Sequence, residues 1–131
     1  MDFKISCEIN ASARAIYNAW LNSEEHAAMT GGDANISQNI GGEFSAWDEY
    51  ISGVNLELIQ NEYIKQRWRT VDFLDNQEDS ILEIKLISIN EHKTILELHH
   101  SQLLDADFHY KQGWVDNYFE PMQSYFEKNK K

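Results

Sequence analysis

Histidine is the residue type in this sequence best suited to acid–base chemistry, and two of the five histidines are adjacent, His99 and His100. A histidine titrates near neutral pH and can therefore act as a general base. Neighbouring residues of a strand point to opposite faces of a sheet, so this pair cannot hold one metal ion together. His100 is the candidate base of an enzyme, and it would need a bound substrate and a group that orients its second ring nitrogen.

Other common catalytic and metal-binding patterns are missing from the sequence. His26, His92 and His109 do not follow HxH or HExxH spacing, and the single Cys7 excludes an internal disulfide and a CxxC site. The glycine pairs at 31–32 and 41–42 lack the context of a phosphate-binding loop. We therefore expect no metal and no cofactor, and we favour binding over catalysis.

The charge of the chain excludes two classes of partner. The 131 residues include 22 acidic and 11 basic side chains, which gives a formal net charge of −11. Nucleic acids and anionic membranes select basic surfaces, so neither is an expected partner. The sequence contains no run of 18 apolar residues, and its first residues alternate like a strand rather than forming a signal peptide. We expect a single domain over residues 1–131 and a cytoplasmic location.

The element that must organise any site is a long helix predicted over Tyr110–Phe126. Its aromatic and apolar residues form an arc too wide for contact with one other helix, so a sheet is the expected partner. Pro121 lies within this pattern and predicts a kink. The two apolar stripes are Tyr110, Trp114, Tyr118 and Tyr125, and Phe108, Val115, Phe119, Met122 and Phe126.

The rest of the chain alternates with period two after a short helical region. Residues 3–9 form a predicted strand, and two short helices follow, the first capped by Asn10 or Ser12 and ending near Leu21. The second begins at residues 22–25 and ends at 29–32. Short polar turns then separate a predicted antiparallel meander with strands at about 34–38, 43–47, 51–59, 63–70, 80–89 and 94–101.

Alternation also predicts the register of two hairpins, with apolar pairs on one face and opposite charges on the other. In the first, the predicted inner pairs are Leu58–Ile64, Leu56–Gln66 and Val54–Trp68, and the outer pairs are Glu57–Lys65 and Asn55–Arg67. In the second, they are Leu86–Leu96, Ile84–Leu98 and Leu82–His100 inside and Lys85–Glu97 outside. The apolar face is where the long helix is expected to pack.

This α+β order resembles the helix-grip (Bet v 1/START-like) fold of the SRPBCC superfamily, in which a curved antiparallel sheet wraps around a long C-terminal helix. Local motifs resemble the activator-of-Hsp90-ATPase C-terminal-like (AHSA1-like) family. They are Gly41-Gly42-Glu43-Phe44, Trp47-Asp48, Tyr50-Ile51-Ser52-Gly53, Asn55-Leu56-Glu57-Leu58, Trp68-Arg69, His100-Ser101, Gly113-Trp114 and Tyr118-Phe119-Glu120-Pro121-Met122. The resemblance covers essentially the whole chain. It implies the fold and leaves the activity open.

A helix-grip fold implies a cavity between the inner face of the sheet and the long helix. Gln66 and His100 fall on the apolar face, where a polar side chain needs a partner. That partner is either a ligand, or the backbone and tyrosine hydroxyls of a filled core. The expected cavity residues are Phe44, Val54, Leu56, Leu58, Gln66, Trp68, Leu82, Ile84, Leu98, His100, Tyr110, Trp114 and Tyr118.

Three functions follow from these observations. The favoured one is non-enzymatic binding of a small hydrophobic ligand in the cavity. The second is a stress-related contact with an Hsp90-type chaperone, which the resemblance suggests, through the acidic loop at residues 72–79. The third is a small-molecule cyclase or hydrolase that uses His100, as in some helix-grip proteins. The identity of the ligand and the oligomeric state are not specified by these residues.

Overall fold

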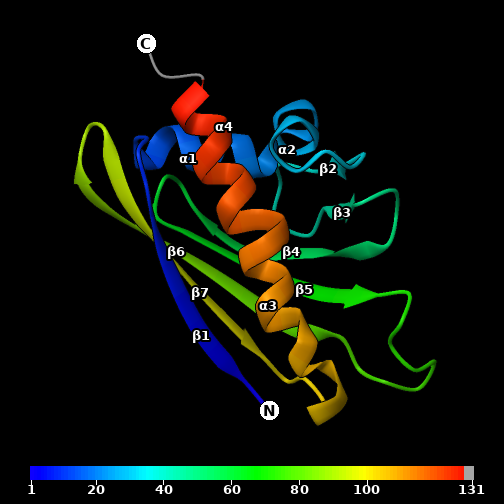
Figure 1. Ribbon diagram of the computed structural model, residues 1–131. Coiled ribbons are helices and arrows are strands. Elements are labelled where there is room, and N and C mark those ends of the chain that lie inside the picture. The colour runs from blue at the N-terminus through cyan, green and yellow to red at the C-terminus, as the bar shows by residue number, and fades with distance from the viewer. Residues whose placement is uncertain (129–131) are drawn as a thin grey trace.

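The computed structural model describes residues 1–128 as one curved antiparallel sheet that wraps around a long C-terminal helix (Figure 1). The strand order in the sheet is β1-β7-β6-β5-β4-β3-β2. The strands are β1 (Phe3–Ile9), β2 (Asn35–Ile36), β3 (Glu43–Ala46), β4 (Ile51–Ile59), β5 (Tyr63–Thr70), β6 (Ser80–Asn90) and β7 (Lys93–Ser101). The α+β helix-grip fold predicted from the sequence is confirmed.

Two short helices, α1 (Ala13–Leu21) and α2 (Ser23–Thr30), connect β1 to the meander. Ser12 caps α1 by accepting the N–H of Ala15, and Asn22 caps α2 by accepting the N–H of Glu25. Gly31 then ends α2 in the left-handed conformation, at φ 89°. In Figure 1 both helices lie at the end of the sheet where the C-terminal helix also ends. Among residues 1–128, no helix is long and apolar enough to cross a membrane.

The C-terminal helical segment is not uniform. A 3₁₀ turn, η1 (Asp105–His109), leads into α3 (Tyr110–Trp114), and a π-helical turn, η2 (Val115–Phe119), joins α3 to α4 (Glu120–Lys128). The N–H of Glu120 donates to the carbonyl of Val115, five residues earlier. The irregularity thus lies directly before Pro121, which has no N–H to donate.

The apolar face of the helical segment packs against the inner face of the sheet. Trp114, Tyr118 and Met122 are buried there, whereas Phe108 is 53% exposed because it lies in the 3₁₀ turn that precedes the helix. The prediction that Phe108 belongs to the buried stripe was therefore wrong. The sheet contributes fully buried aliphatic residues to the same core, namely Ile64, Leu82, Ile84, Leu96 and Leu98.

The register of the β6–β7 hairpin is confirmed at every predicted pair. Leu86 lies opposite Leu96, Ile84 opposite Leu98, Leu82 opposite His100, and Lys85 opposite Glu97. Alternation determines this register because a slip of one residue would expose the whole apolar face.

The β4–β5 register is confirmed only next to the turn, at Leu58–Ile64 and Glu57–Lys65. A bulge between Asn55 and Glu57 shifts the remaining pairs, so that Gln66 faces Asn55, Arg67 faces Val54 and Trp68 faces Gly53. The predicted pairs Leu56–Gln66, Val54–Trp68 and Asn55–Arg67 were wrong.

A buried asparagine explains the bulge. The side chain of Asn55 is fully buried and donates to the carbonyls of Ser37 and Asn39, at 2.8 and 3.1 Å. It also accepts a hydrogen bond from Gln66 at 2.9 Å. Asn55 thus satisfies the polar groups of the β2–β3 loop, which the apolar Leu56 in the same place would leave unpaired. Strict alternation cannot anticipate an inward polar residue of this kind.

Candidate functional site

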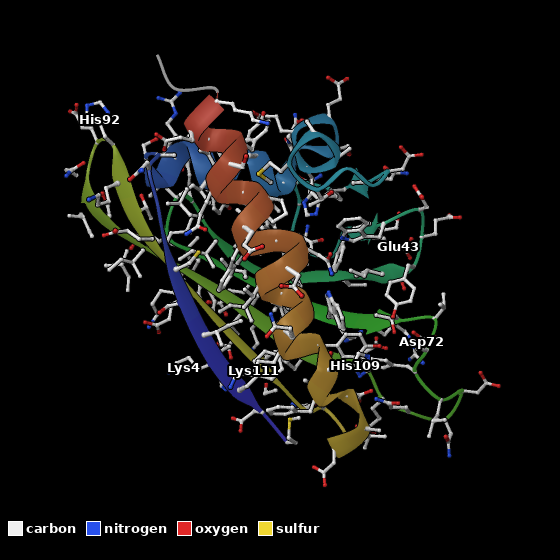
Figure 2. All side chains as sticks on the ribbon, viewed as in Figure 1. Lys4, Glu43, Asp72, His92, His109 and Lys111 are labelled. Carbon is white, nitrogen blue, oxygen red and sulfur yellow. The ribbon has the colours of Figure 1, made fainter. Side chains whose placement is uncertain are left out.

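A cavity of about 350 Å³ lies between the C-terminal helix and the end of the sheet formed by β4 and β5. Its walls come from the β3–β4 turn, from β4 and β5, and from α3 and η2. The lining residues are Trp47, Tyr50, Ile51, Trp68, Tyr110, Gly113, Trp114, Asn117 and Tyr118. In Figure 2 the labelled Asp72 and His109, which contact Tyr50 and Tyr110, lie on the same side of the helix. Six of the nine lining residues are aromatic, so the walls of the cavity are predominantly apolar.

The β3–β4 turn places Trp47 and Tyr50 through an unusual backbone conformation. Trp47, Asp48 and Glu49 all have positive φ, at 53°, 58° and 73°. A non-glycine residue in the left-handed region costs on the order of 1 kcal/mol. The N–H of Asp48 donates to the carbonyl of Asp33 at 3.1 Å, and the Asp48 carboxylate accepts the N–H of Asp33 at 3.0 Å. These two bonds hold the strained turn at the cavity.

The helix supplies the opposite wall through residues spaced four apart. Tyr110, Trp114 and Tyr118 share one face, and all three are buried. Gly113 lies beside them, and a Cβ built there would meet only the amide of Asn117, at 3.8 Å. Because nothing else approaches this position, the missing side chain leaves space that belongs to the cavity.

Hydrogen bonds fix the tyrosines of the cavity. The hydroxyl of Tyr50 donates to the Asp72 carboxylate at 2.5 Å, and that of Tyr110 bonds with the Thr70 hydroxyl at 2.5 Å. Burial, and then the hydrogen bond to Asp72, raise the pKa of Tyr50 above its ordinary value. Burial likewise raises the pKa of Tyr118, opposed by a side-chain hydrogen bond with Trp47. All three hydroxyls are therefore anchored, and Tyr50 and Tyr118 stay neutral at physiological pH.

Tyr118 is held by a buried histidine that sequence patterns did not identify as important. His26 Nδ1 lies 2.9 Å from the carbonyl of Trp20, which can only accept, so Nδ1 carries the proton. Burial lowers the pKa of His26, against the effect of the Trp20 carbonyl, so the ring is neutral and Nε2 is an acceptor. The hydroxyl of Tyr118 therefore donates to Nε2, at 2.9 Å. These two hydrogen bonds of His26 connect α2 to the wall of the cavity.

His100 is placed in the core and not at the cavity. The indole N–H of Trp114 donates to Nδ1 at 3.1 Å, which leaves the ring proton on Nε2, directed to the hydroxyl of Ser80 at 2.8 Å. The Ser80 hydroxyl in turn donates to the carbonyl of Trp68 at 2.7 Å. Burial, and then the charge of His99, lower the pKa of His100 to about 3. Both ring nitrogens are therefore engaged by partners in the core, and the low pKa makes the neutral ring a weak base.

Four of the predicted cavity residues line the cavity, namely Trp68, Tyr110, Trp114 and Tyr118. Gln66 and His100 bond instead with Asn55, Ser80 and Trp114, as expected for a filled core. The other predicted residues that do not line the cavity are Phe44, Leu58, Leu82, Ile84 and Leu98, which pack in or against the core, and Val54 and Leu56, which the bulge displaces.

Five lining residues were missed by sequence reasoning, which are Trp47, Tyr50, Ile51, Gly113 and Asn117. Trp47 and Tyr50 flank the acidic pair Asp48-Glu49, in a segment predicted as a polar turn. Two large aromatic residues in so short a turn were the available signal, because a solvated turn has no need of them. Nothing in the sequence marks Gly113 as the opening in the helix wall.

Comparison with known proteins is consistent with this architecture. A family model described as activator of Hsp90 ATPase homolog 1-like protein matches residues 10–127. No curated protein matches the sequence significantly. The structure is similar to that of an HSP90 activator from Plasmodium falciparum, with a TM-score of 0.87 at 22% identity, covering 97% of this chain and 96% of the other.

Two further solved structures share the fold. The Aha1 dimer from Colwellia psychrerythraea gives a TM-score of 0.79 at 14% identity, covering 95% of both chains. A protein from Mesorhizobium loti gives a TM-score of 0.81 at 13% sequence identity, and the match covers 98% of both chains. At these identities the structural likeness shows the fold alone, and the match over residues 10–127 shows the family. The chain belongs to the activator of Hsp90 ATPase homolog 1-like family.

Proposed function

We propose that the protein is a cytoplasmic, non-enzymatic binder of a small hydrophobic ligand, which occupies the cavity between the sheet and the C-terminal helix. The observation that carries this proposal is the cavity of about 350 Å³, lined mainly by aromatic residues, beside the buried apolar core. Ligand sites commonly have volumes of roughly 300–1,000 Å³ and apolar walls with a few polar groups. The anchored tyrosine hydroxyls and the Asn117 amide are the polar groups here.

Two features support a cavity that is kept open. The left-handed residues 47–49 retain Trp47 and Tyr50 at the cavity despite the cost of their backbone conformation. Gly113 replaces a side chain that would otherwise fill the space, although glycine inside a helix costs roughly 0.5–1 kcal/mol relative to alanine. Neither feature improves the stability of the fold, and both serve an open cavity.

Filling the cavity from Gly113 is the direct test. We expect Gly113→Met to weaken binding of an uncharged fluorescent naphthalene probe by at least about tenfold, because the new side chain occupies the ligand volume. The fold should be retained, since methionine is a better helix former than glycine. Gln112→Met is the matched control, because Gln112 is exposed on the same turn. Equal probe affinity in wild type, Gly113→Met and Gln112→Met would reject the cavity as the binding site.

A native ligand can be sought in parallel by native mass spectrometry of protein isolated from its own host. A small molecule that is retained by the wild type and lost in Gly113→Met would identify the ligand class. Retention by both proteins would place the molecule elsewhere on the chain.

A second candidate is contact with an Hsp90-type chaperone through the β5–β6 loop. Leu74 is 60% exposed in this loop, and Asp75 and Glu78 are exposed beside it. Arg69 holds the loop in place by donating to the carbonyls of Leu74 and Gln77 and to Asp79. An ordered acidic loop with the exposed apolar residues Val71 and Leu74 suits a basic protein surface.

The test of this candidate is the ATPase rate of such a chaperone with and without the protein. We expect stimulation that falls with salt and with the double change Asp75→Asn and Glu78→Gln. Asp79 is left intact because it pairs with Arg69 at 2.7 Å. An unchanged ATPase rate on adding the wild-type protein would reject the contact.

A further inference from the structure

We propose that the ligand of this cavity is an organic cation, a quaternary ammonium or protonated amine carried on an apolar body. This inference rests on the proposed function and specifies the chemical class of the ligand. It is carried by three properties of the cavity together: its ring walls, the engagement of its hydrogen-bond donors, and the charge around it.

The walls are aromatic rings in several orientations. Trp47 stands at 73° to Tyr118, Trp68 at 82° to Tyr110, and Trp114 at 48° to Tyr118. These lining rings are therefore inclined to one another and do not stack in parallel. The π face of tryptophan or tyrosine attracts a cation that lies within about 6 Å of the ring centroid. An aromatic enclosure of this composition therefore favours a cationic head group over a neutral one of the same shape.

Three hydrogen-bond donors of the lining are occupied by protein partners. The hydroxyl of Tyr50 donates to Asp72, that of Tyr118 to His26, and the indole N–H of Trp114 to His100. An anionic ligand needs N–H or O–H groups directed at it, and these three point to protein partners instead. A quaternary ammonium needs no donor, because ring faces and oxygen atoms suffice.

The charged side chains around the cavity also favour a cationic ligand over an anionic one. Asp48 and Glu49 are exposed between the lining residues Trp47 and Tyr50, and Asp72 holds the Tyr50 hydroxyl. Among residues 1–128, no lysine or arginine lines the cavity.

Three basic side chains that are adjacent in the chain to lining residues make contacts of their own, whereas Arg67, beside Trp68, is exposed. Arg69 pairs with Asp79 at 2.7 Å, and Lys111 lies over the ring of Phe108 at 5.5 Å. His109 lies against Tyr110, with ring centroids 4.2 Å apart. The field at the cavity is thus dominated by carboxylates, which attract cations and repel anions.

The test compares two ligands of the same shape. Benzyltrimethylammonium and neopentylbenzene differ only in a positively charged nitrogen in place of a carbon. We expect the cation to displace the uncharged naphthalene probe from the wild type at about tenfold lower concentration than neopentylbenzene. A neopentylbenzene affinity equal to or better than that of the cation would overturn the cation proposal and leave ligand binding intact. Failure of the probe and of both compounds to bind would instead overturn the proposed function.

Variants at Tyr50 test whether the aromatic ring attracts the cation or whether any apolar side chain at this position would serve as well. Tyr50 is half-buried at the cavity, so substitutions there should be tolerated. Tyr50→Leu removes the π face. It should lower the ratio of the affinity for the cation to that for neopentylbenzene by about threefold to tenfold, and it should change the affinity for neopentylbenzene itself by less than about twofold. Tyr50→Phe keeps the ring and should retain most of the advantage. Equal losses for both compounds in Tyr50→Leu would contradict a cation–π contribution from this residue.

Discussion

Acidification should destabilise this protein through a histidine that is buried in its neutral form. His100 is fully buried, and its pKa in the folded state is about 3, compared with an ordinary value of 6.5. Between these values the unfolded chain binds a proton that the folded chain does not, so the free energy of unfolding falls as the pH is lowered. The destabilisation that His100 causes is absent well above pH 6.5, and it grows progressively as the pH is lowered toward 3.

The magnitude follows from the two pKa values. Lowering the pH from 7 to 5 charges the imidazole in almost all unfolded chains and in very few folded ones. The resulting loss is about 2 kcal/mol from His100 alone. His26 acts in the same direction, because burial lowers its pKa as well. A loss of this size is a large fraction of the stability of a small domain.

The assay is urea unfolding of the wild type and His100→Gln at pH 5, 6 and 7. The fall in the unfolding free energy of the variant from pH 7 to 5 should be smaller than that of the wild type by about 2 kcal/mol. Contributions from carboxylates are common to both proteins and cancel in this difference. His92→Gln, at the exposed β6–β7 turn, is the control and should behave as the wild type does. Identical pH dependence in wild type and His100→Gln would refute the reasoning.

Three further predictions concern the scaffold. Gly53→Ala should cost about 3 kcal/mol in urea unfolding, because the new Cβ would lie 1.8 Å from the carbonyl oxygen of Arg67, and native stability in this variant would contradict that packing. Ser12→Ala should lower the unfolding free energy by about 1 kcal/mol through loss of the α1 cap, whereas Ser12→Asn, which also caps, should lower it far less. Arg69→Met should release the β5–β6 loop, seen as faster proteolysis and amide exchange at residues 72–79 with little change in the core; unchanged protection there would show that Arg69 does not hold the loop.

Much of the fold was determined by the sequence itself. Alternation with period two predicted the strands of the meander. The β6–β7 register followed because Leu86–Leu96 and Ile84–Leu98 pair on the inner face while Lys85 and Glu97 pair on the outer face. The long aromatic stripe of the C-terminal segment predicted a helix packed on a sheet. Capping residues such as Ser12 marked the helix starts, because their effect depends only on neighbours three residues away.

The candidate site was decided by the tertiary structure. Trp47 and Trp114 lie 67 positions apart in the chain and line the same cavity only because a left-handed turn and a helix face each other across it. The bulge at Asn55 depends on loop carbonyls that no local pattern reveals.

The same holds for the polar groups of the core. His100 has the residue type of a catalytic base, and only the tertiary structure shows that its ring nitrogens bond with Trp114 and Ser80 in the core. Local periodicity fixes which residues turn inward, because it depends on near neighbours. Which inward residues leave a space, and which polar atoms remain available to a ligand, depends on contacts between segments far apart in the chain.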